Sequence, residues 1–163
     1  MPSLRNSSRR PFPALAIVGL IAVGGLVLAA PAFAASVSAK VTPYQITRGK
    51  IFTVKLTGAG DVVDPGVTQR VVAWTQANTP ACASNANLEF ARLQKNPVIL
   101  RNITSQPFSI TKRVTSGALG KRRVCAYLYN FGSASFPLAR ATTTYKVVLP
   151  LCHRGQTRGC RRH

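Results

Sequence analysis

A central β-strand is predicted at residues 122–129, which read RRVCAYLY. Successive side chains of a strand point to opposite faces of the sheet, and here both faces are apolar. One face carries Val124, Ala126 and Leu128, and the other carries Cys125, Tyr127 and Tyr129. A strand that is apolar on both faces is typical of the middle of a sheet. We therefore expect this strand to be central and buried on both sides.

Six further segments are predicted to be strands, because apolar and polar residues alternate in them or because β-forming residues gather there. They are residues 37–41, 52–56, 68–76, 98–103, 107–114 and 141–149, and Trp74 lies inside the third. Turns are predicted between them at residues 58–61, 64–66, 116–120 and 131–133. Glycine and proline favour such turns, because glycine accepts a positive φ and proline fixes its own. The sequence thus predicts about seven strands.

One short helix is predicted within this series of strands, at residues 84–94. Apolar residues recur there at helical spacing: Ala86, Phe90 and Leu93. Ser84 or Asn85 can cap the amino terminus of the helix, and Pro97 stops the segment. The helix begins just after Cys82.

The chain has four cysteines, and outside the cytoplasm an even number is most simply two disulfides. Four cysteines allow three pairings. We favour Cys82 with Cys125, in the body of the chain, and Cys152 with Cys160, which close a short loop near the carboxyl terminus. The first bond would pin the helical connection to the predicted central strand.

Together these elements resemble an immunoglobulin-like or fibronectin-III-like β-sandwich, with short strands, regular turns, a tryptophan within a strand and a late cysteine. Cys82 starts the helical connection, and Cys125-Ala126-Tyr127 lies in a late strand. This arrangement is similar to small exported immunoglobulin-like domains of bacteria. The resemblance implies a mainly β fold, an antiparallel sandwich of about seven strands with one short helix in a connection. It also implies an extracellular module, usually without known activity.

The first 34 residues read as a secretory signal peptide. Three arginines precede an apolar, uncharged run at residues 14–30, and Ala32-Phe33-Ala34 fits the small-residue pattern of a cleavage site. The sequence therefore predicts a secreted or cell-surface, extracytoplasmic protein that begins at Ala35 after cleavage. Residues 8–12 resemble in part the twin-arginine signal of proteins exported already folded, so the export route stays open. An uncleaved anchor is a third interpretation.

The chain is strongly basic, with a net charge of +19 from 22 Lys and Arg and three acidic residues. The leader holds three of the arginines and no acidic residue, so the mature chain carries +16. Such a charge attracts anionic surfaces and polymers. An exported protein meets anionic cell-envelope polymers or lipid headgroups, and we favour these partners over nucleic acid. Candidate contacts are Lys121, Arg122, Arg123, Arg154, Arg158, Arg161 and Arg162.

No catalytic or cofactor-binding site is predicted, and no small-molecule substrate. Acid–base catalysis needs paired carboxylates or a poised histidine, whereas the three acidic residues are scattered and both histidines lie near the carboxyl terminus. Asp61 and Asp64 share one turn and supply too few oxygen ligands for a calcium loop. Two alternatives concern the last residues: a zinc site that adds His153 and His163 to the cysteines, and a Cys152 thiol nucleophile beside His153. We favour no metal.

The chain is accordingly divided into a signal peptide (1–34), an immunoglobulin-like β-sandwich domain (35–150) and a basic, cysteine-containing tail (151–163). The predicted function is that of a non-catalytic exported binding or cell-surface module with a basic face for anionic polymers or membrane surfaces. The tail is expected to contribute to binding rather than to folding. The alternative is a structural or protein-interaction domain without a specific anionic partner, and an enzyme of unrecognised type is the third class.

Overall fold

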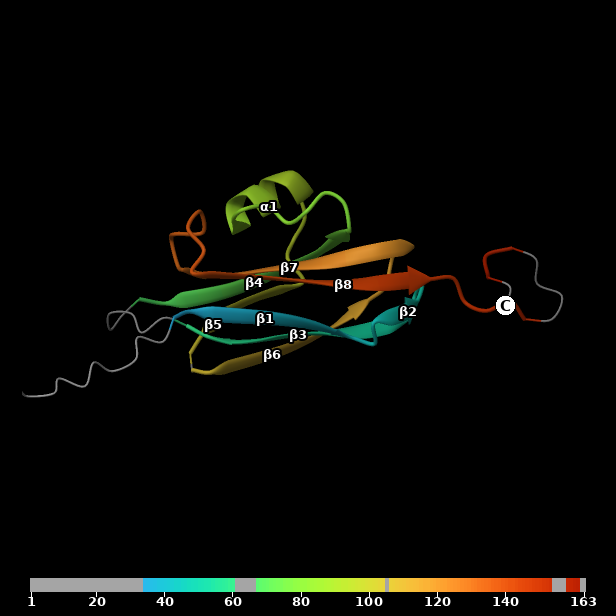
Figure 1. Ribbon diagram of the computed structural model, residues 1–163, viewed down its shortest axis with the longest axis horizontal. Coiled ribbons are helices and arrows are strands. Elements are labelled where there is room, and N and C mark those ends of the chain that lie inside the picture. The colour runs from blue at the N-terminus through green and yellow to red at the C-terminus, as the bar shows by residue number, and fades with distance from the viewer. Residues whose placement is uncertain (1–33, 61–66, 105, 154–157, 162–163) are drawn as a thin grey trace, which may run out of the picture. The chain divides into compact units, whose positions relative to one another are not determined.

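The described residues form eight strands and one helix (Figure 1). The structure is a computed structural model that describes residues 34–60, 67–104, 106–153 and 158–161, all within one compact unit, Pro31–His163. The predicted signal peptide up to residue 33 lies outside the described residues, as do Asp61 and Asp64. Within the described ranges, no helix has the length and apolar character needed to cross a membrane.

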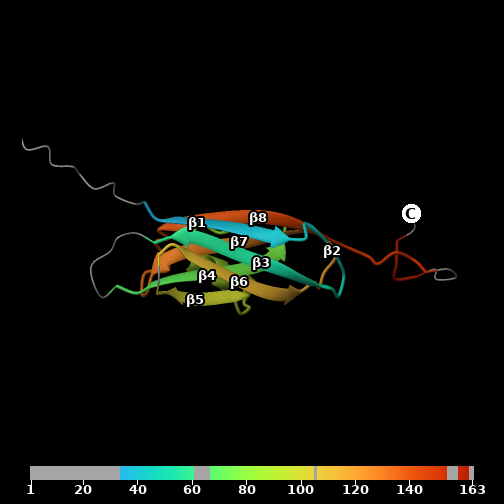
Figure 2. The ribbon, with the colours of Figure 1, turned by 90° about the horizontal axis from the view of Figure 1, so that it is seen from below.

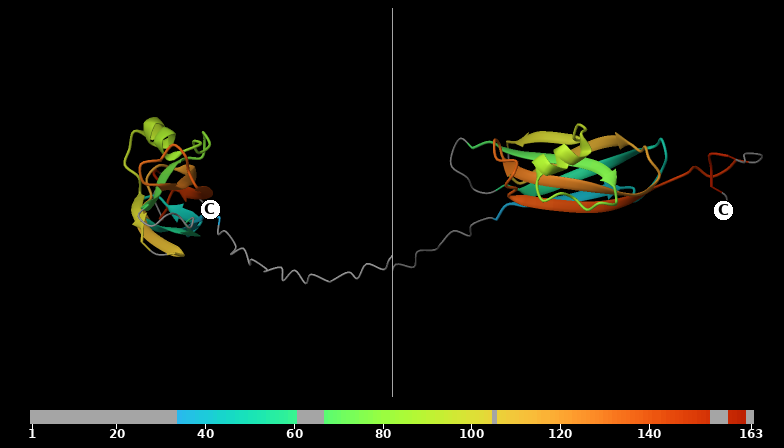
Figure 3. Two further views of the ribbon diagram at one scale, coloured as in Figure 1. Left: turned by 90° about the vertical axis from the view of Figure 1, so that its left-hand side faces the viewer. Right: turned by 90° about the horizontal axis from the view of Figure 1, so that it is seen from above.

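The strands form two sheets that face one another (Figures 1 and 2). The three-stranded sheet has the order β1-β3-β6, and the five-stranded sheet has the order β2-β8-β7-β4-β5. The strands are β1 (Ser36–Thr42), β2 (Gln45–Thr47), β3 (Ile51–Ala59), β4 (Gln69–Ala77), β5 (Ile99–Ile103), β6 (Phe108–Thr115), β7 (Gly120–Asn130) and β8 (Ala139–Val148). Helix α1 (Ala86–Leu93) lies in the connection between β4 and β5, on the outer side of the five-stranded sheet (Figure 3).

This layout confirms the predicted fold class, a mainly β, immunoglobulin-like sandwich with one short helix in a connection. Every strand pair is antiparallel except β2 with β8. The chain changes sheet repeatedly, so strands close in sequence such as β5 and β6 lie in different sheets. Such crossing between two packed antiparallel sheets is what distinguishes a sandwich from a single folded meander.

Strand β7 occupies the central position that its two apolar faces predict. It pairs with β4 on one side and with β8 on the other. Val124, Ala126 and Leu128 face the other sheet and are buried in the main core with Phe52, Val54, Leu56, Val71 and Ala73. The opposite face of β7 belongs to a second apolar cluster, which consists of Val72, Trp74, Ala86, Cys125, Tyr127 and Tyr129. Trp74 therefore packs beneath α1 and not between the sheets.

Two differences from the predicted strands have local causes. β2 was not predicted; the chain leaves β1 at Pro43, which has no N–H to donate to a ladder, and then pairs for three residues with β8. The predicted turn at residues 58–61 begins later, because β3 continues through Ala59. Gly58 is needed inside the strand, since a Cβ there would lie 2.1 Å from the carbonyl oxygen of Ser36.

Helix α1 begins and ends close to the predicted residues but buries a different face. Asn85 is its cap and accepts a hydrogen bond from the Leu88 N–H (2.9 Å). The predicted apolar face of Ala86, Phe90 and Leu93 is only partly correct, because Phe90 is 50% exposed whereas Glu89 is fully buried. The helix turns Glu89 toward the sheet because buried hydrogen-bond donors meet it there.

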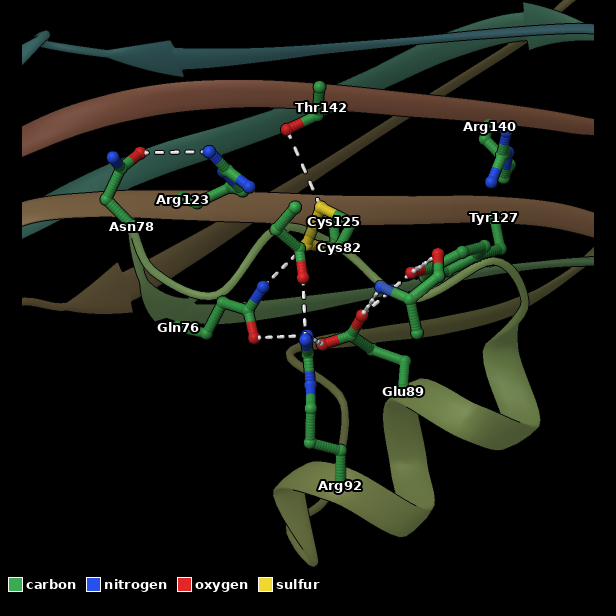
Figure 4. Close-up of a disulfide and its surroundings, with 12 residues drawn as sticks. Gln76, Asn78, Cys82, Glu89, Arg92, Arg123, Cys125, Tyr127, Arg140 and Thr142 are labelled. Carbon is green, nitrogen blue, oxygen red and sulfur yellow. Dashed lines mark hydrogen bonds and ion pairs between the residues drawn. A yellow bond between two sulfur atoms is a disulfide. The ribbon is translucent and has the colours of Figure 1, made fainter.

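The Glu89 carboxylate is satisfied by three donors from different parts of the chain (Figure 4). Oε2 accepts from the Ala83 N–H (2.6 Å) and from the Tyr127 hydroxyl (2.8 Å), and Oε1 accepts from Arg92 Nη2 (2.5 Å). A buried carboxylate is tolerated only when it is paired and hydrogen-bonded in this way. Burial raises the pKa of the Tyr127 hydroxyl above its usual range, and the hydrogen bond to Glu89 raises it further.

Both favoured disulfides are present, so the predicted pairing is confirmed. Cys82 is bonded to Cys125 and Cys152 to Cys160, and the described residues include no free cysteine. The Cys82–Cys125 bond lies on the outer face of the five-stranded sheet (Figure 4). It fastens the connection that leads into α1 to strand β7, as expected, and it does not bridge the two sheets. Gln76 Nε2 lies 3.0 Å from the Cys125 sulfur and its Oε1 accepts from Arg92, which links the disulfide to the Glu89 network.

The two disulfides are expected to differ in their contribution to stability. A Cys82→Ala/Cys125→Ala variant should lose about 3 to 4 kcal/mol in its free energy of unfolding, because a crosslink over 43 residues restricts the unfolded chain. The matched Cys152→Ala/Cys160→Ala variant should leave the sandwich nearly unchanged, because its ring closes after the last strand. Urea unfolding of both variants gives the comparison. Equal losses would show that the tail is part of the folding unit.

Stability should fall at alkaline pH because of the buried tyrosines. Burial raises the pKa of Tyr127, Tyr129 and Tyr145 above the value of about 10 that an unfolded tyrosine has. Below that pH both states keep these protons, whereas above it the unfolded state loses them first, so the free energy of unfolding decreases as pH rises. A Tyr127→Phe variant should show a pH slope shallower by at most about 1.4 kcal/mol per pH unit. Urea titrations at pH values on either side of 10 measure this; identical slopes in both proteins would contradict it.

Candidate anion-binding surface

Negative side chains are almost absent from the described surface. Glu89 is the single carboxylate side chain among the described residues, and it is fully buried and paired with Arg92. Glu89 is thus unavailable to other cations, and the exposed Lys and Arg side chains give the described part of the surface a net positive charge. Where these side chains gather is decided by strand register.

The predicted group Lys121, Arg122 and Arg123 is divided between two faces of β7. Arg122 is opposite Tyr145, on the side of the main core, whereas Lys121 is opposite Lys146 and Arg123 is opposite Thr144 on the outer face. The division follows from the alternation of side chains along a strand. Lys121 and Arg123 therefore share the outer face with Lys146, a residue that the sequence reasoning did not select.

Arg122 interacts with two groups in the body of the protein, Tyr145 and Lys95. Burial raises the pKa of the Tyr145 hydroxyl, and the Arg122 guanidinium opposes this rise through a hydrogen bond and its charge. Burial also lowers the pKa of Lys95, and the charge of Arg122 lowers it further. Lys95 in turn donates to the carbonyl oxygen of Thr75. Arg122 thus interacts with the body of the protein, which sets it apart from the exposed candidates.

The tail is described only in part. Arg158 and Arg161 are exposed, and Arg154, Arg162 and His163 lie outside the described residues. The Arg161 N–H donates to the Pro150 carbonyl oxygen (2.9 Å), and the Cys152 N–H donates to the Arg161 carbonyl oxygen (3.1 Å). With the Cys152–Cys160 bond these contacts close a local ring. Since both sulfurs are in that bond, neither is a thiolate that could bind zinc or attack a substrate.

A second basic surface lies on the outer face of the three-stranded sheet, and sequence reasoning missed it. Lys40 of β1 stands directly opposite Lys55 of β3. Arg113 of β6 stands opposite Thr53, one row further along the same face. All three cations are exposed. We call this surface the Lys40–Lys55 face; its other outward positions carry mainly hydroxyls, from Ser38, Thr42, Thr53, Thr57, Ser109 and Thr111.

The Lys40–Lys55 face concentrates charge at short range. Side chains directly opposite across antiparallel strands have Cβ atoms about 5 Å apart, and diagonal neighbours lie about 7 to 8 Å apart. Lys55 has Lys40 as its direct neighbour and Arg113 as a diagonal one. Like charges at such positions destabilise a sheet. An anion with several charged groups would relieve this repulsion, and the surrounding hydroxyls can donate or accept hydrogen bonds to it.

The same face is open to solvent along its length. Figure 2 views the molecule from this side and shows β1, β3 and β6 in front, with no described segment across them. The outer face of the five-stranded sheet is different, because α1 and the connection before it cover β4 and β7 there (Figure 3). The Lys121–Lys146 pair is therefore confined to the end of that sheet.

Comparisons with known proteins give no family. No protein-family model matches the sequence, and no curated protein is significantly similar to it. Among solved structures, the crystal structure of the CARDB domain of the PF1109 protein from Pyrococcus furiosus is 13% identical over 72% of this chain and 90% of that chain, with a TM-score of 0.48. The solution structure of the same domain is 14% identical over 72% and 96%, with a TM-score of 0.43. A β-glucosidase from Listeria innocua is 14% identical over 69% of this chain and 16% of its own, with a TM-score of 0.41. At these values the likenesses carry no inference about function.

Proposed function

We propose that this protein is a non-catalytic, exported binding module that holds acidic polymers of the cell envelope on its Lys40–Lys55 face. The observation that carries the proposal is the direct opposition of Lys40 and Lys55, with Arg113 on the next row, in a sheet face that is open and has no carboxylate among its described residues. Repulsion among these like charges lowers the stability of the free protein. A bound polyanion would relieve this repulsion, and the concentrated positive charge attracts it.

A polymer fits this face better than a lipid surface does. Proteins that lie on membranes insert apolar side chains into the headgroup region in addition to using positive charge. The rows that contain Lys40, Lys55 and Arg113 are filled with threonine, and the exposed Ile51 lies at the end of β3. Hydroxyls and cations on a flat surface are suited to an extended chain that carries regularly spaced anionic groups.

Two observations support export. The two disulfides are typical of proteins from oxidising compartments. Strand β1 begins at Ser36, so cleavage after Ala34 would remove no residue of the sandwich. Ala35 already packs against the main core. A mature protein that begins at Ala35 therefore keeps every described element.

Processing is expected to give a mature chain that begins at Ala35. Ala32 and Ala34 provide the small residues that a signal peptidase requires. Amino-terminal sequencing of the protein recovered from the culture medium or cell envelope determines the start. Recovery of intact protein beginning at Met1 from the membrane fraction would instead support an uncleaved anchor.

Neutralising the Lys40–Lys55 face should weaken polymer binding. A Lys40→Gln/Lys55→Gln/Arg113→Gln variant should bind immobilised polyglycerol phosphate about tenfold more weakly at low salt, since exposed ion pairs contribute about 0.2 to 1 kcal/mol each. The difference should vanish as salt screens the charges. The same variant should be as stable as the original protein or slightly more stable, because a like-charge pair has been removed. Thermal unfolding checks this second result.

Two variants with the same loss of charge serve as controls. Arg48→Gln/Lys50→Gln/Arg101→Gln removes three exposed cations elsewhere and should bind nearly as well as the original protein. Lys121→Gln/Arg123→Gln/Lys146→Gln neutralises the other outer face; a larger effect there would move the binding surface to the five-stranded sheet. If all three variants bind alike, the charge has no specific partner, which is the structural-domain alternative.

The tail is expected to contribute to binding rather than to folding. Truncation after Leu151 should therefore make the salt dependence of polymer binding shallower without lowering the melting temperature of the sandwich.

A further inference from the structure

A cavity of about 400 Å³ lies on the outer face of the five-stranded sheet and is lined in part by Cys82. Figure 4 shows the disulfide of this cysteine and the side chains around it. The walls of the cavity are residues 81–83 of the connection before α1, the neighbouring part of β7, and the start of β8. Its size falls in the range of cavities that bind small molecules. It lies on the sheet opposite to the Lys40–Lys55 face, so it is independent of the proposed polymer site.

Two arginines line the cavity and neither is neutralised. Arg123 Nη2 donates to the Asn78 side-chain oxygen (3.3 Å), and Arg140 Nη1 donates to the Ser84 carbonyl oxygen (3.3 Å). Each guanidinium is thus oriented by one neutral acceptor and keeps further donors. Neither has a carboxylate partner among the described residues, and the buried Nε of Arg123 has no hydrogen-bond acceptor. An arginine that keeps such donors can bind a carboxylate or phosphate through two parallel hydrogen bonds.

The two arginines stand at opposite ends of the cavity. Arg140 is opposite Tyr127, whereas Arg123 lies four residues earlier on β7. Four residues of a strand span about 13 Å. In Figure 4 the two side chains lie on either side of the disulfide. They therefore offer two separate cationic sites and do not converge on one anion.

The space between these sites is largely apolar. It is lined by the Cys82–Cys125 disulfide and by Ala81 and Ala83, and the Thr142 hydroxyl oxygen lies 3.6 Å from the Cys82 sulfur. Ala126 and Ala141 border it with their backbone, because their side chains face the main core. The Tyr127 hydroxyl is already bonded to Glu89, and the Glu89 charge is balanced by Arg92. The wall is also held in place before any ligand arrives, because Arg92 Nη1 donates to the Ala81 carbonyl oxygen (2.6 Å) and the disulfide fixes Cys82. A preformed site loses little conformational entropy on binding.

We propose that this cavity binds an elongated dianion, in which two carboxylate or phosphate groups are joined by a short apolar spacer. One anionic group is bound by Arg123 and the other by Arg140, and the spacer lies over the disulfide. Such a ligand matches the cavity in charge at both ends and in polarity between them. This site would add recognition of a small molecule to the binding of a polymer.

The first test is a series of ligands of increasing length. Straight-chain α,ω-dicarboxylates from succinate to sebacate are titrated into the mature protein, and binding is followed by calorimetry and by the NMR signals of the arginine Nε–H groups. The affinity should pass through a maximum at one chain length, and the matching monocarboxylate should bind at least tenfold more weakly. The corresponding bisphosphonates distinguish phosphate from carboxylate as the preferred end group. Affinity that does not depend on length, or no saturable binding in either series, overturns the proposal.

The second test identifies the residues. Arg123→Gln and Arg140→Gln should each weaken the best ligand about tenfold, as expected when a charged hydrogen-bonding partner is removed. Arg140 is exposed, so its variant keeps the result interpretable if Arg123→Gln unfolds. Arg113→Gln is the matched control on the opposite sheet and should bind the dianion normally while it weakens polymer binding. A reduction by Arg113→Gln equal to that by Arg140→Gln would show that the protein responds only to total charge.

Discussion

The burial of strand β7 on both faces is the constraint on which the rest of the structure depends. Because both faces of this strand are apolar, each face must be covered by another part of the chain. The two covers are different. The three-stranded sheet covers Val124, Ala126 and Leu128, whereas α1 and its connection cover Cys125 and Tyr127. The first cover is held by the apolar packing of the main core. The second is small, and a disulfide together with the buried Glu89 network holds it in place.

Both proposed binding surfaces follow from this unequal coverage. The three-stranded sheet has a covered inner face and leaves its outer face free, where the period of two places Lys40, Lys55 and Arg113 among hydroxyls. The smaller cover does not extend over the whole of the five-stranded sheet. At its margin the cavity between residues 81–83 and strand β8 remains, with Arg123 and Arg140 at its ends. The fold thus separates a broad, open surface for a polymer from a cavity for a small ligand.

The sequence predicted most of the strands, the helix and both disulfides, because these depend on local periodicity, turn residues and cysteine spacing. It did not predict that Glu89, and not Phe90, would face the sheet, since the Tyr127 hydroxyl that bonds Glu89 comes from a strand 38 residues away. It also grouped Arg122 with its neighbours, although alternation along β7 sends that side chain to the core side. The Lys40–Lys55 opposition and the Arg123–Arg140 spacing are properties of strand register, which one-dimensional charge patterns do not contain.

The position of the Cys82–Cys125 bond on the outer face has a consequence for how the protein responds to its surroundings. The sulfur atoms belong to the small cover and lie apart from the packed interior between the two sheets. A thiol reductant would therefore leave the connection and the wall of the cavity held by the Glu89 network alone, while the sandwich, including its open basic face, keeps its apolar interior. Attachment to a polymer and recognition of a small molecule would then differ in their sensitivity to the redox state of the compartment.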